Sequence, residues 1–519
     1  MAAQEAGFDI GELLRPEAFP HATTGIALRE THISWVILTG PCAYKIKKPV
    51  KAGFIDATTL ELRRFYCEEE LRLNGRLAPE IYLAVVPITR RNGQLIVGGT
   101  GSAVEYAVRM QQFPPEDELP ALLATKAVTV DAIAALGALL GGFHLSLPAA
   151  AWTGTAERTA RMLETVFGNL GQLQGDVNHL GLPTHLGRLA DWSRRTADSL
   201  DDTFRQRERG GQVRECHGDL HLANIVRIAG RLVPFDCIDF DAGLRWIDVI
   251  NDVAFLFMDL AGHDRPDLAF AMLSRYLETT GDYAGLRVLP FYAVYRALVR
   301  AKVDAFAAVQ MPDRADEFRQ RLERRLHTAA KLTNPAPPTL VIMHGVSGSG
   351  KSWVSERLVA ALPALRIRSD IERKRMTGSL GSRVQAGVGK GLYSPSLSHR
   401  VYAHLADGAA ACLAAGCSVI VDAAFLNAGD RELFQGLASR LGVPFLIVAC
   451  EAAPDVLEAR VAARAARGLD PSDATSSVLA DQLKRRHPLS ALEQQHAVVV
   501  DSAAADAIDT VLRKRPVTP

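Results

Sequence analysis

A short glycine-rich segment constrains the fold of this 519-residue chain more than any other feature. Residues Gly345–Ser352, with the sequence GVSGSGKS, fit the pattern G-x-x-x-x-G-K-[ST]. The segment directly follows the apolar run Leu340–Met343, typical of a buried strand, and precedes a helix expected over Trp353–Ala361. Glycines let backbone N–H groups wrap around a phosphate, and the start of the helix adds a favourable dipole. The alternative, a glycine-rich turn with a chance lysine, does not account for the strand before it and the helix after it.

The sequence around this segment alternates between apolar runs and helical stretches. Strands are predicted at 340–343, 365–367, 418–421, 445–449 and 497–500. Strands that alternate with helices are typical of a parallel, doubly wound sheet. We therefore predict an α/β domain over residues 340–519.

Residues Gly345–Ser352, which we call the phosphate loop, supply groups expected to bind ATP and Mg²⁺. Lys351 would reach the terminal phosphates, and the hydroxyl group of Ser352 would hold Mg²⁺. The predicted strand at 418–421 ends in Asp422, the form expected of a second Mg²⁺ ligand. The loop residues predicted to bind the nucleotide are Gly345, Ser347, Gly348, Ser349, Gly350, Lys351 and Ser352.

Polar residues beyond the loop indicate transfer chemistry. Asp370 follows the second predicted strand, where it could accept a proton from a substrate hydroxyl, and Arg373 one turn later could hold the acceptor. Arg460 and Arg464 lie on a helix that could close over ATP and neutralise charge in the transition state. The alternatives are that Asp370 caps the helix that follows it and that the two arginines form a solvated face.

Together these motifs, from Leu340 to Asp501, resemble the P-loop kinases of small molecules and polynucleotide ends. This group includes gluconate kinase, the kinase domain of polynucleotide kinase and the zeta-type toxins. The resemblance implies transfer of the γ-phosphate to a hydroxyl group and leaves the acceptor open. A polynucleotide-end kinase would need a basic groove beside Asp370, for which the basic residues between 366 and 375 are candidates.

A proline-rich segment, residues 333–339, separates this domain from residues 1–332. Prolines cannot continue a helix and favour extended backbone, so a short semi-rigid linker is predicted. Before it, strands are expected at 33–38, 43–47, 81–88 and 104–110, a helix over 58–77, and a mostly helical region with strand-like pieces at 225–228 and 232–238. We therefore predict an α+β, two-lobed domain, with a small lobe over about 1–112, a large lobe over about 113–332 and a nucleotide site in the cleft between them.

A second set of acidic motifs lies in the predicted large lobe. His217–Asn224 matches H-G-D-x-x-x-x-N, and two further aspartates, Asp236 and Asp239, follow the next strand. In this chemistry one Asp orients the acceptor hydroxyl, an Asn binds Mg²⁺, and a later Asp holds the metal against the phosphates. The first two are Asp219 and Asn224. For the third, strand length favours Asp236 and the local sequence Ile-Asp-Phe favours Asp239.

These motifs, with the stretches 30–35, 43–49, 67–74 and 295–302, resemble the aminoglycoside phosphotransferase superfamily, relatives of choline kinase and distant relatives of protein kinases. More narrowly, the chain is similar to a bacterial family that fuses such a protein-kinase-like domain to a C-terminal P-loop domain. The resemblance implies that Lys45, or Lys47 on the same strand face, pairs with the ATP phosphates. It also implies that Glu70, or Glu69, holds that lysine.

Other interpretations of these residues stay open. Residues 45–48 could be an exposed basic edge strand, and residues 68–70 could be a solvated helix face. The glycine-rich loop of protein kinases is missing before Lys45, because Thr31–Gly40 contains a single glycine. Phosphate cover must then come from other backbone. His217 is expected to support the loop and not to carry protons.

Composition restricts the remaining function classes. The 59 Lys+Arg nearly balance the 58 Asp+Glu, so overall charge does not support a nucleic-acid binder. The first residues lack the apolar run of a signal peptide, no apolar stretch is long enough to span a bilayer, and the seven scattered cysteines suggest reduced thiols. A cytoplasmic location without a membrane partner is therefore expected.

The sequence as a whole predicts a bifunctional phosphotransferase, in which each domain uses ATP and Mg²⁺ to phosphorylate a hydroxyl group of a small molecule. One alternative is a regulatory ATP-binding protein in which only the C-terminal domain is catalytic. The other is a polynucleotide-end kinase. The acceptors and the oligomeric state stay open.

Overall fold

The computed structural model describes residues 8–52, 55–154, 156–182, 185–380, 394–467 and 476–514. The chain divides into two compact units, each built from several stretches of sequence. The first comprises residues 1–129, 146–155 and 207–252, and the second comprises 130–145, 156–206 and 253–519. Most helices of the predicted large lobe thus share a unit with the phosphate-loop domain. The division of the chain at residues 333–339 stays a prediction.

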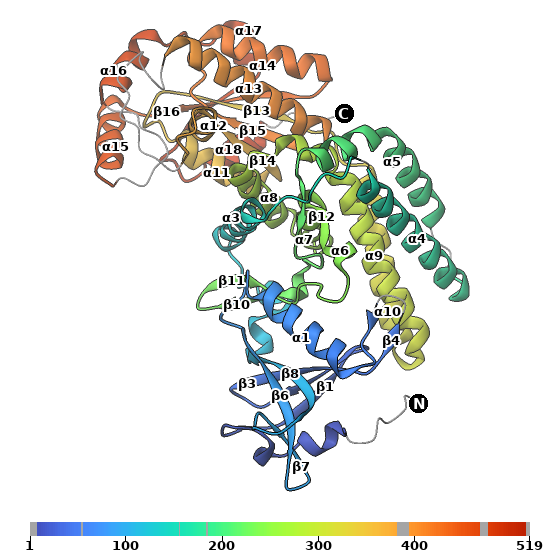
Figure 1. The fold of residues 1–519 in the computed structure, drawn as a ribbon. Coiled ribbons are helices and arrows are strands. Elements are labelled where there is room, and N and C mark those ends of the chain that lie inside the picture. Colours follow the sequence, from blue (N-terminus) through green and yellow to red (C-terminus); the bar gives the residue numbers. More distant parts are fainter. Residues whose placement is uncertain are drawn as a thin grey trace. The chain divides into compact units, whose positions relative to one another are not determined.

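A six-stranded antiparallel sheet in the order β1-β2-β3-β8-β6-β7 forms the N-terminal part of the first unit (Figure 1). Helix α1 (Leu60–Asn74) packs against β3, β6 and β8. It begins after Thr59, whose side chain accepts a hydrogen bond from the backbone N–H of Leu62. The strands are β1 (Ala27–Glu30), β2 (Ser34–Leu38), β3 (Cys42–Lys47), β6 (Tyr82–Arg91), β7 (Gln94–Val97) and β8 (Ala103–Gln111).

Four of these strands lie where the sequence predicts them, and α1 lies within the helix predicted over 58–77. The sequence pattern predicts neither β1 nor β7. All residues of β1 are exposed, so the strand lacks the alternation of apolar and polar residues that identifies half-buried strands. Its pairing with β2 fixes it in the sheet.

Short strands carry the acidic motifs of the first unit. β10 (Ile225–Ile228) and β11 (Arg231–Pro234) form an antiparallel hairpin, and β9 (Val213–Glu215) pairs with β12 (Trp246–Asp248). The strand predicted at 232–238 is shorter than expected, because β11 ends at Pro234, which has no N–H to donate. Two residues later, Asp236 has a φ of 63°, outside the extended region.

The second unit contains most of the long helices. Helix α9 packs against α4 and α10. None of the helices that the structure describes has the length and apolar content needed to cross a bilayer. The helices of this unit up to residue 333 are α3 (Val130–Ser146), α4 (Glu157–His179), α5 (Leu186–Arg209), α7 (Val249–Gly262), α8 (Pro266–Thr280), α9 (Leu289–Gln310) and α10 (Ala315–Thr333). The last residue of α3, the last residues of α5 and the first residues of α7 belong to the first unit.

A five-stranded sheet in the order β14-β15-β13-β16-β17 forms the C-terminal part of the second unit, and all its strand pairs are parallel. The predicted α/β fold with a parallel sheet is therefore confirmed. The carboxyl ends of β14 and β15 coincide, since Arg368 lies in register with Asp422. The strands are β13 (Leu340–His344), β14 (Ala364–Arg368), β15 (Ser418–Asp422), β16 (Phe445–Glu451) and β17 (Ala497–Asp501).

Candidate active sites

β3 and α1 bring together the first group of predicted residues. Nζ of Lys45, on β3, lies 2.7 Å from Oε1 of Glu70, on α1, and 2.7 Å from Oδ1 of Asp236. Glu70 is fully buried, whereas Glu69 pairs with Arg72 on the same helix. Of the two glutamates, Glu70 is therefore the one that holds the lysine.

Lys47 forms a second, more deeply buried set of contacts. It lies two residues after Lys45, so the two side chains leave the same face of β3. Its Nζ lies 2.6 Å from Oε2 of Glu70 and also contacts Asp239. Because β3 lies between β2 and β8, the alternative of an exposed edge strand is wrong. Glu70 is thus shared by two lysines, each of which also reaches one aspartate.

The charges around Glu70 keep this cluster ionised. Burial by itself would raise the pKa of Glu70, but the ammonium groups of Lys45 and Lys47 outweigh burial and lower the pKa to about 2. Burial would likewise lower the pKa of Lys45, but Asp236 and Glu70 hold it well above its ordinary value. Burial raises the pKa of Asp239, against the opposing effect of Lys47. Lys45 and Glu70 are therefore both charged at neutral pH.

The segment His217–Asn224, which we call the HGD loop, carries the predicted catalytic aspartate. Nδ2 of Asn224 donates to the backbone carbonyl oxygen of Asp219 at 3.0 Å and to Oδ2 of the same residue at 3.1 Å. Nε2 of His217 lies 2.9 Å from the carbonyl oxygen of Phe235, and burial lowers the pKa of His217. His217 therefore supports the loop in its neutral form, while the side chain of Asp219 stays 37% exposed.

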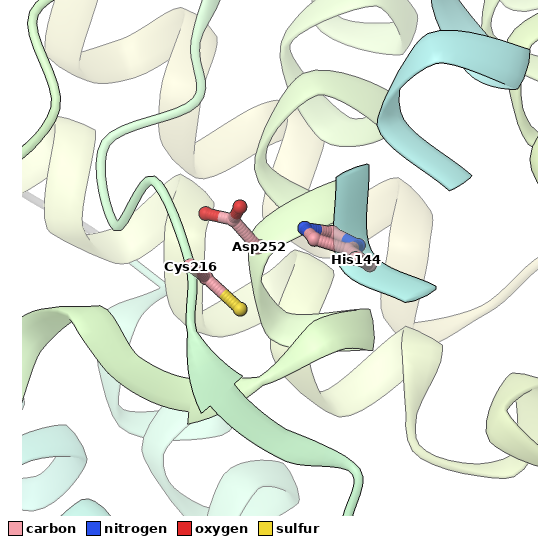
Figure 2. A group of neighbouring side chains, drawn as sticks. All are labelled: His144, Cys216 and Asp252. Carbon is pink, nitrogen blue, oxygen red and sulfur yellow. The ribbon is translucent and has the colours of Figure 1, made fainter. Parts of the chain in front are cut away.

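Gly218 and Asp252 fix the turn at the start of the HGD loop. Gly218 has a φ of 85°, and a Cβ there would meet the carbonyl oxygen of Leu244 at 2.9 Å. Oδ2 of Asp252 accepts the backbone N–H of His217 at 3.1 Å, and Oδ1 accepts that of Gly218 at 2.8 Å. Figure 2 shows Asp252 beside Cys216, the residue before the loop. Sequence reasoning missed Asp252, which lies on α7 and holds the loop through both carboxylate oxygens.

Asp236 and Asp239 occupy different environments. Asp236 is 43% exposed, and its positive φ is a conformation that aspartate tolerates and that is common at functional sites. Its backbone N–H donates to Oη of Tyr82 at 3.1 Å. The preceding residue, Phe235, donates its N–H to the carbonyl oxygen of Asn224 at 2.9 Å, which joins this segment to the HGD loop. Asp239 is buried against the second lysine of β3.

The turn between β1 and β2, residues 31–33, contains no glycine. The N–H of Thr31 donates to the carbonyl oxygen of Ser34 at 2.9 Å, and its Oγ1 accepts the N–H of Ser34 at 3.0 Å. These groups are therefore engaged within the turn. The turn therefore lacks the glycines that let backbone N–H groups wrap a phosphate.

The phosphate loop connects β13 to α11 (Lys351–Ala361). A Cβ at Gly350 would lie 2.2 Å from Oγ of Ser502, so no larger residue fits there. Nζ of Lys351 donates to the carbonyl oxygen of Val346 at 2.8 Å, which places the ammonium group over the loop. Left-handed φ values occur at three loop positions, Gly345 (147°), Gly348 (85°) and Gly350 (89°). The loop thus has the backbone form that wraps a phosphate.

Ser352 and Asp422 supply oxygen atoms of the kind that Mg²⁺ prefers. Both line the same cavity as Lys351. Asp422 ends β15, and its Oδ2 accepts a hydrogen bond from Oγ of Ser355 at 3.0 Å. Sequence reasoning missed Ser355, which lies one helical turn after Ser352 on α11. The donor set fits Mg²⁺, as does the pair of Asn224 and Asp236 in the other unit.

A cavity of about 580 Å³ opens beside the phosphate loop. Asp370 and Arg373 line it from α12 (Ser369–Met376), and Nη1 of Arg373 donates to Oγ of Ser398 at 3.2 Å. The N-cap residue of α12 is Arg368 and makes no capping hydrogen bond through its side chain, so Asp370 is not the cap. The predicted residues that line the cavity are Ser347, Gly348, Gly350, Lys351, Ser352, Asp370, Arg373, Asp422 and Arg460, whereas Gly345 and Ser349 do not line it.

Arg460, on α15 (Pro454–Arg467), lies against the phosphate loop. Its Nη1 donates to the carbonyl oxygen of Gly348 at 3.2 Å and to Oγ of Ser502 at 2.9 Å, so it does not belong to a solvated face. The side chain of Arg464 lies outside the described residues. Oε1 of Gln482 accepts the N–H of Ser347 at 2.7 Å, where the loop is expected to meet phosphate. Sequence reasoning missed Gln482, and no motif around it gives a signal.

Three of the basic residues between 366 and 375 have acidic neighbours. A guanidinium nitrogen of Arg366 lies 3.7 Å, and one of Arg368 lies 3.4 Å, from an oxygen of Glu278. Nε of Arg375 lies 3.1 Å from Oε2 of Glu372. These arginines are therefore paired with acids, and Arg368 also lines the cavity beside Asp370.

Two stretches of the chain match known families. Residues 66–289 match the phosphotransferase enzyme family, and residues 340–489 match an AAA domain family. Uncharacterized proteins of Mycobacterium tuberculosis and Mycobacterium bovis are 29% identical to this chain over 456 residues, which cover 88% of this chain and 89% of each relative.

Solved structures of kinases align with each part of the chain. A choline/ethanolamine kinase family protein from Mesorhizobium loti covers 60% of this chain and 90% of its own, at 13% identity and a TM-score of 0.36. A gluconokinase from Sinorhizobium meliloti covers 35% of this chain and 93% of its own, at 21% identity and a TM-score of 0.26.

The family matches contain most residues of the two groups, whereas Lys45 and Lys47 precede the first match. Glu70, the HGD loop and Asp236 lie within the first match, and the phosphate loop, Asp370 and Asp422 lie within the second. Two kinase-type domains support a phosphotransferase that uses ATP. The chain therefore contains a domain of the phosphotransferase enzyme family over residues 66–289, followed by an AAA domain over residues 340–489.

Proposed function

We propose that this chain is a bifunctional ATP-dependent phosphotransferase, in which each domain transfers the γ-phosphate of ATP to a hydroxyl group of a small molecule. The cavity beside the phosphate loop carries the proposal, because Lys351, Asp422 and Asp370 all line it. A protein that only senses ATP needs residues that bind the phosphates and the metal, but no residue that accepts a proton. A further carboxylate in the same cavity supports a proton acceptor for a substrate hydroxyl.

In the C-terminal domain, Lys351 and the N–H groups of the phosphate loop hold the terminal phosphates. Asp370 accepts the proton of the acceptor hydroxyl, and Arg373 orients the acceptor. Arg460 neutralises charge that develops during transfer. Ser352 and Asp422 would hold Mg²⁺, which supplies neutralisation of the phosphate charges when it is bound.

In the N-terminal domain, Asp219 orients and deprotonates the acceptor hydroxyl. Glu70 holds Lys45 for the phosphates. Asn224 and Asp236 would hold Mg²⁺. The exposure of Asp236 supports it as the metal ligand, because Asp239 is buried as the partner of Lys47.

The regulatory alternative is favoured by the turn at residues 31–33, which lacks the glycines that would cover a phosphate. The ion pair of the partly buried Lys45 with the fully buried Glu70 supports catalysis in this half instead. We do not favour the polynucleotide-end kinase, because the charges of Arg366 and Arg368 are paired with Glu278, although Arg368 also lines the cavity beside Asp370. A cytoplasmic location is part of the proposal, and the seven free cysteines support it.

The test is a phosphorylation screen of a metabolite pool with γ-labelled ATP, comparing the wild type with Asp219→Ala and Lys351→Ala. We expect each variant to lose a different subset of labelled products. An Asp219→Ala product pattern identical to the wild type, with all products lost in Lys351→Ala, would identify the N-terminal domain as a regulator. A wild type that labels no acceptor at all would contradict the proposal.

A further inference from the structure

Helix α8 covers part of the parallel sheet that carries the phosphate loop, although it precedes the proline-rich segment in sequence. It packs against β14 and α11. Ala271 of α8 belongs to the same apolar core as Val341 of β13 and Leu358 of α11. Helix α8 and the phosphate-loop domain also belong to one compact unit. The C-terminal site is therefore built partly on a helix from the predicted kinase-like domain.

The second half of α8 directs polar side chains toward β14. Oγ of Ser274 accepts the backbone N–H of Arg366 at 2.9 Å. Glu278, which is 7% exposed, places Oε1 3.4 Å from Nη1 of Arg368 and Oε2 3.7 Å from Nη2 of Arg366. Nη1 of Arg275, on the same helix, lies 2.7 Å from Oε1. One buried carboxylate thus faces three guanidinium groups.

The side chain of Arg366 contacts both Glu278 and the residues around the proposed magnesium ligands. Its Nη1 lies 3.4 Å from Oγ of Ser355 and 3.4 Å from the carbonyl oxygen of Ser352. Oγ of Ser355 in turn donates to Oδ2 of Asp422 at 3.0 Å. Arg366, Ser355 and Asp422 are all buried. The hydroxyl group of Ser355 therefore lies between the guanidinium of Arg366 and the carboxylate of Asp422.

The buried guanidinium group of Arg366 and the partly buried one of Arg368 lie on one strand and repel each other, so their positions depend on the acids around them. Nη2 of Arg366 lies 3.7 Å from Glu278 and 3.8 Å from Glu356, and its Nη1 reaches Asp422 through Oγ of Ser355. Of these three acids, Asp422 and Glu278 are buried and Glu356 is exposed. Without Glu278, Asp422 would be the buried acid left to attract Arg366. A direct pair between the two would compete with Mg²⁺ for the carboxylate oxygens.

We propose that Glu278 is a positioning residue for the phosphate-loop site, holding Arg366 on the α8 side so that Asp422 stays available to Mg²⁺. The proposal rests on the function proposed above for the C-terminal domain. Glu278 does not line the cavity, so it acts through Arg366 and Ser355. A residue of the predicted kinase-like domain thereby sets the magnesium requirement of the other domain.

The test compares Glu278→Gln with Glu356→Gln in the full chain, each combined with Asp219→Ala. Both glutamates lie near Nη2 of Arg366, at 3.7 and 3.8 Å, but the side chain of Glu356 is 60% exposed. Binding of a fluorescent ATP analogue is titrated with Mg²⁺, and the signal that persists in Lys351→Ala is subtracted. We expect the Mg²⁺ concentration for half-maximal binding to rise roughly fivefold to twentyfold in E278Q. In E356Q it should rise less than about twofold.

A second pair of variants separates positioning from general destabilisation. In E278Q combined with Arg366→Met the competing cation is gone, so the Mg²⁺ requirement should return to within about twofold of R366M alone. Glu278→Asp keeps the charge, so its Mg²⁺ requirement should lie between those of the wild type and E278Q. This variant preserves the test if E278Q does not fold. A wild-type Mg²⁺ requirement in E278Q, an equal shift in E356Q, or no rescue by R366M would overturn the proposal. Because the readout is binding, a wild type without phosphate transfer would contradict the proposed function and leave this test in force.

Discussion

Glu70→Gln removes the carboxylate that Lys45 and Lys47 share, and should destabilise the first unit. In the folded protein the pKa of Glu70 is about 2, against an ordinary value of 4.5. Since each pKa unit corresponds to about 1.4 kcal/mol, the difference is worth roughly 3 kcal/mol. Removing one partner of a buried ion pair independently costs about 3–5 kcal/mol. We therefore expect E70Q to lower the free energy of local unfolding around α1 and β3 by about 3 kcal/mol at pH 7.

The pH dependence gives the same prediction a second check. Because folding lowers the pKa of Glu70, its contribution is fully present above 4.5 and is lost as the pH falls toward about 2. The difference in unfolding free energy between the wild type and E70Q should therefore shrink over this interval. Other carboxylates titrate there too, so the difference between the two proteins, and not either curve alone, is the informative quantity.

Hydrogen exchange of the amides in α1 and β3 measures this quantity, because a chain of several units has no single two-state unfolding free energy. The matched control is Glu68→Gln on the same helix, since Glu68 pairs with Arg64 and both side chains are about half exposed. Loss of this exposed ion pair should lower the free energy of local unfolding by less than about 0.5 kcal/mol. A change of less than about 1 kcal/mol in E70Q, or an equal change in E68Q, would refute the reasoning.

Four further variants test other parts of the two sites. Asp236→Asn should abolish Mg²⁺-dependent transfer in the N-terminal domain with little loss of stability. Asp239→Asn should lower local stability by about 3 kcal/mol, because the buried Lys47 loses one of its two carboxylate partners and keeps only Glu70. Activity assays and hydrogen exchange separate the two variants. Arg460→Ala should lower kcat of the C-terminal domain roughly 10²–10³-fold and change the Kd for ATP less than about fivefold. Burial lowers the pKa of His344 to about 4 from an ordinary value of 6.5, so its contribution to stability is present above 6.5 and lost as the pH falls toward 4. In His344→Asn, the protection of the β13 amides from hydrogen exchange should therefore decrease less as the pH falls from 6.5 toward 4.

The local motifs of both sites could be predicted from the sequence. The phosphate loop is defined by residues within a single strand–loop–helix segment, so its position follows directly from Gly345–Ser352. Asp422 could be predicted because an apolar run ends at it. The link between Asp219 and Asn224 follows from their short spacing in the HGD loop.

Contacts between distant parts of the chain could not be predicted. Lys47 and Asp239 are separated by 192 residues, so the pattern around each gives no sign of their pairing. That pairing distinguishes the buried Asp239 from the exposed Asp236, a choice that strand length and local sequence left open. Similarly, nothing near Glu278 indicates that α8 packs against β14, because that contact depends on the tertiary fold.

The most direct measurement of the central claim is the stoichiometry of ATP binding in the presence of Mg²⁺, by equilibrium dialysis of the full chain. Two independent sites predict two ATP molecules per wild-type chain, one in Lys45→Met, one in Lys351→Ala and none in the double variant. A wild type that binds a single ATP, or a single variant that loses both, would contradict two separate nucleotide sites.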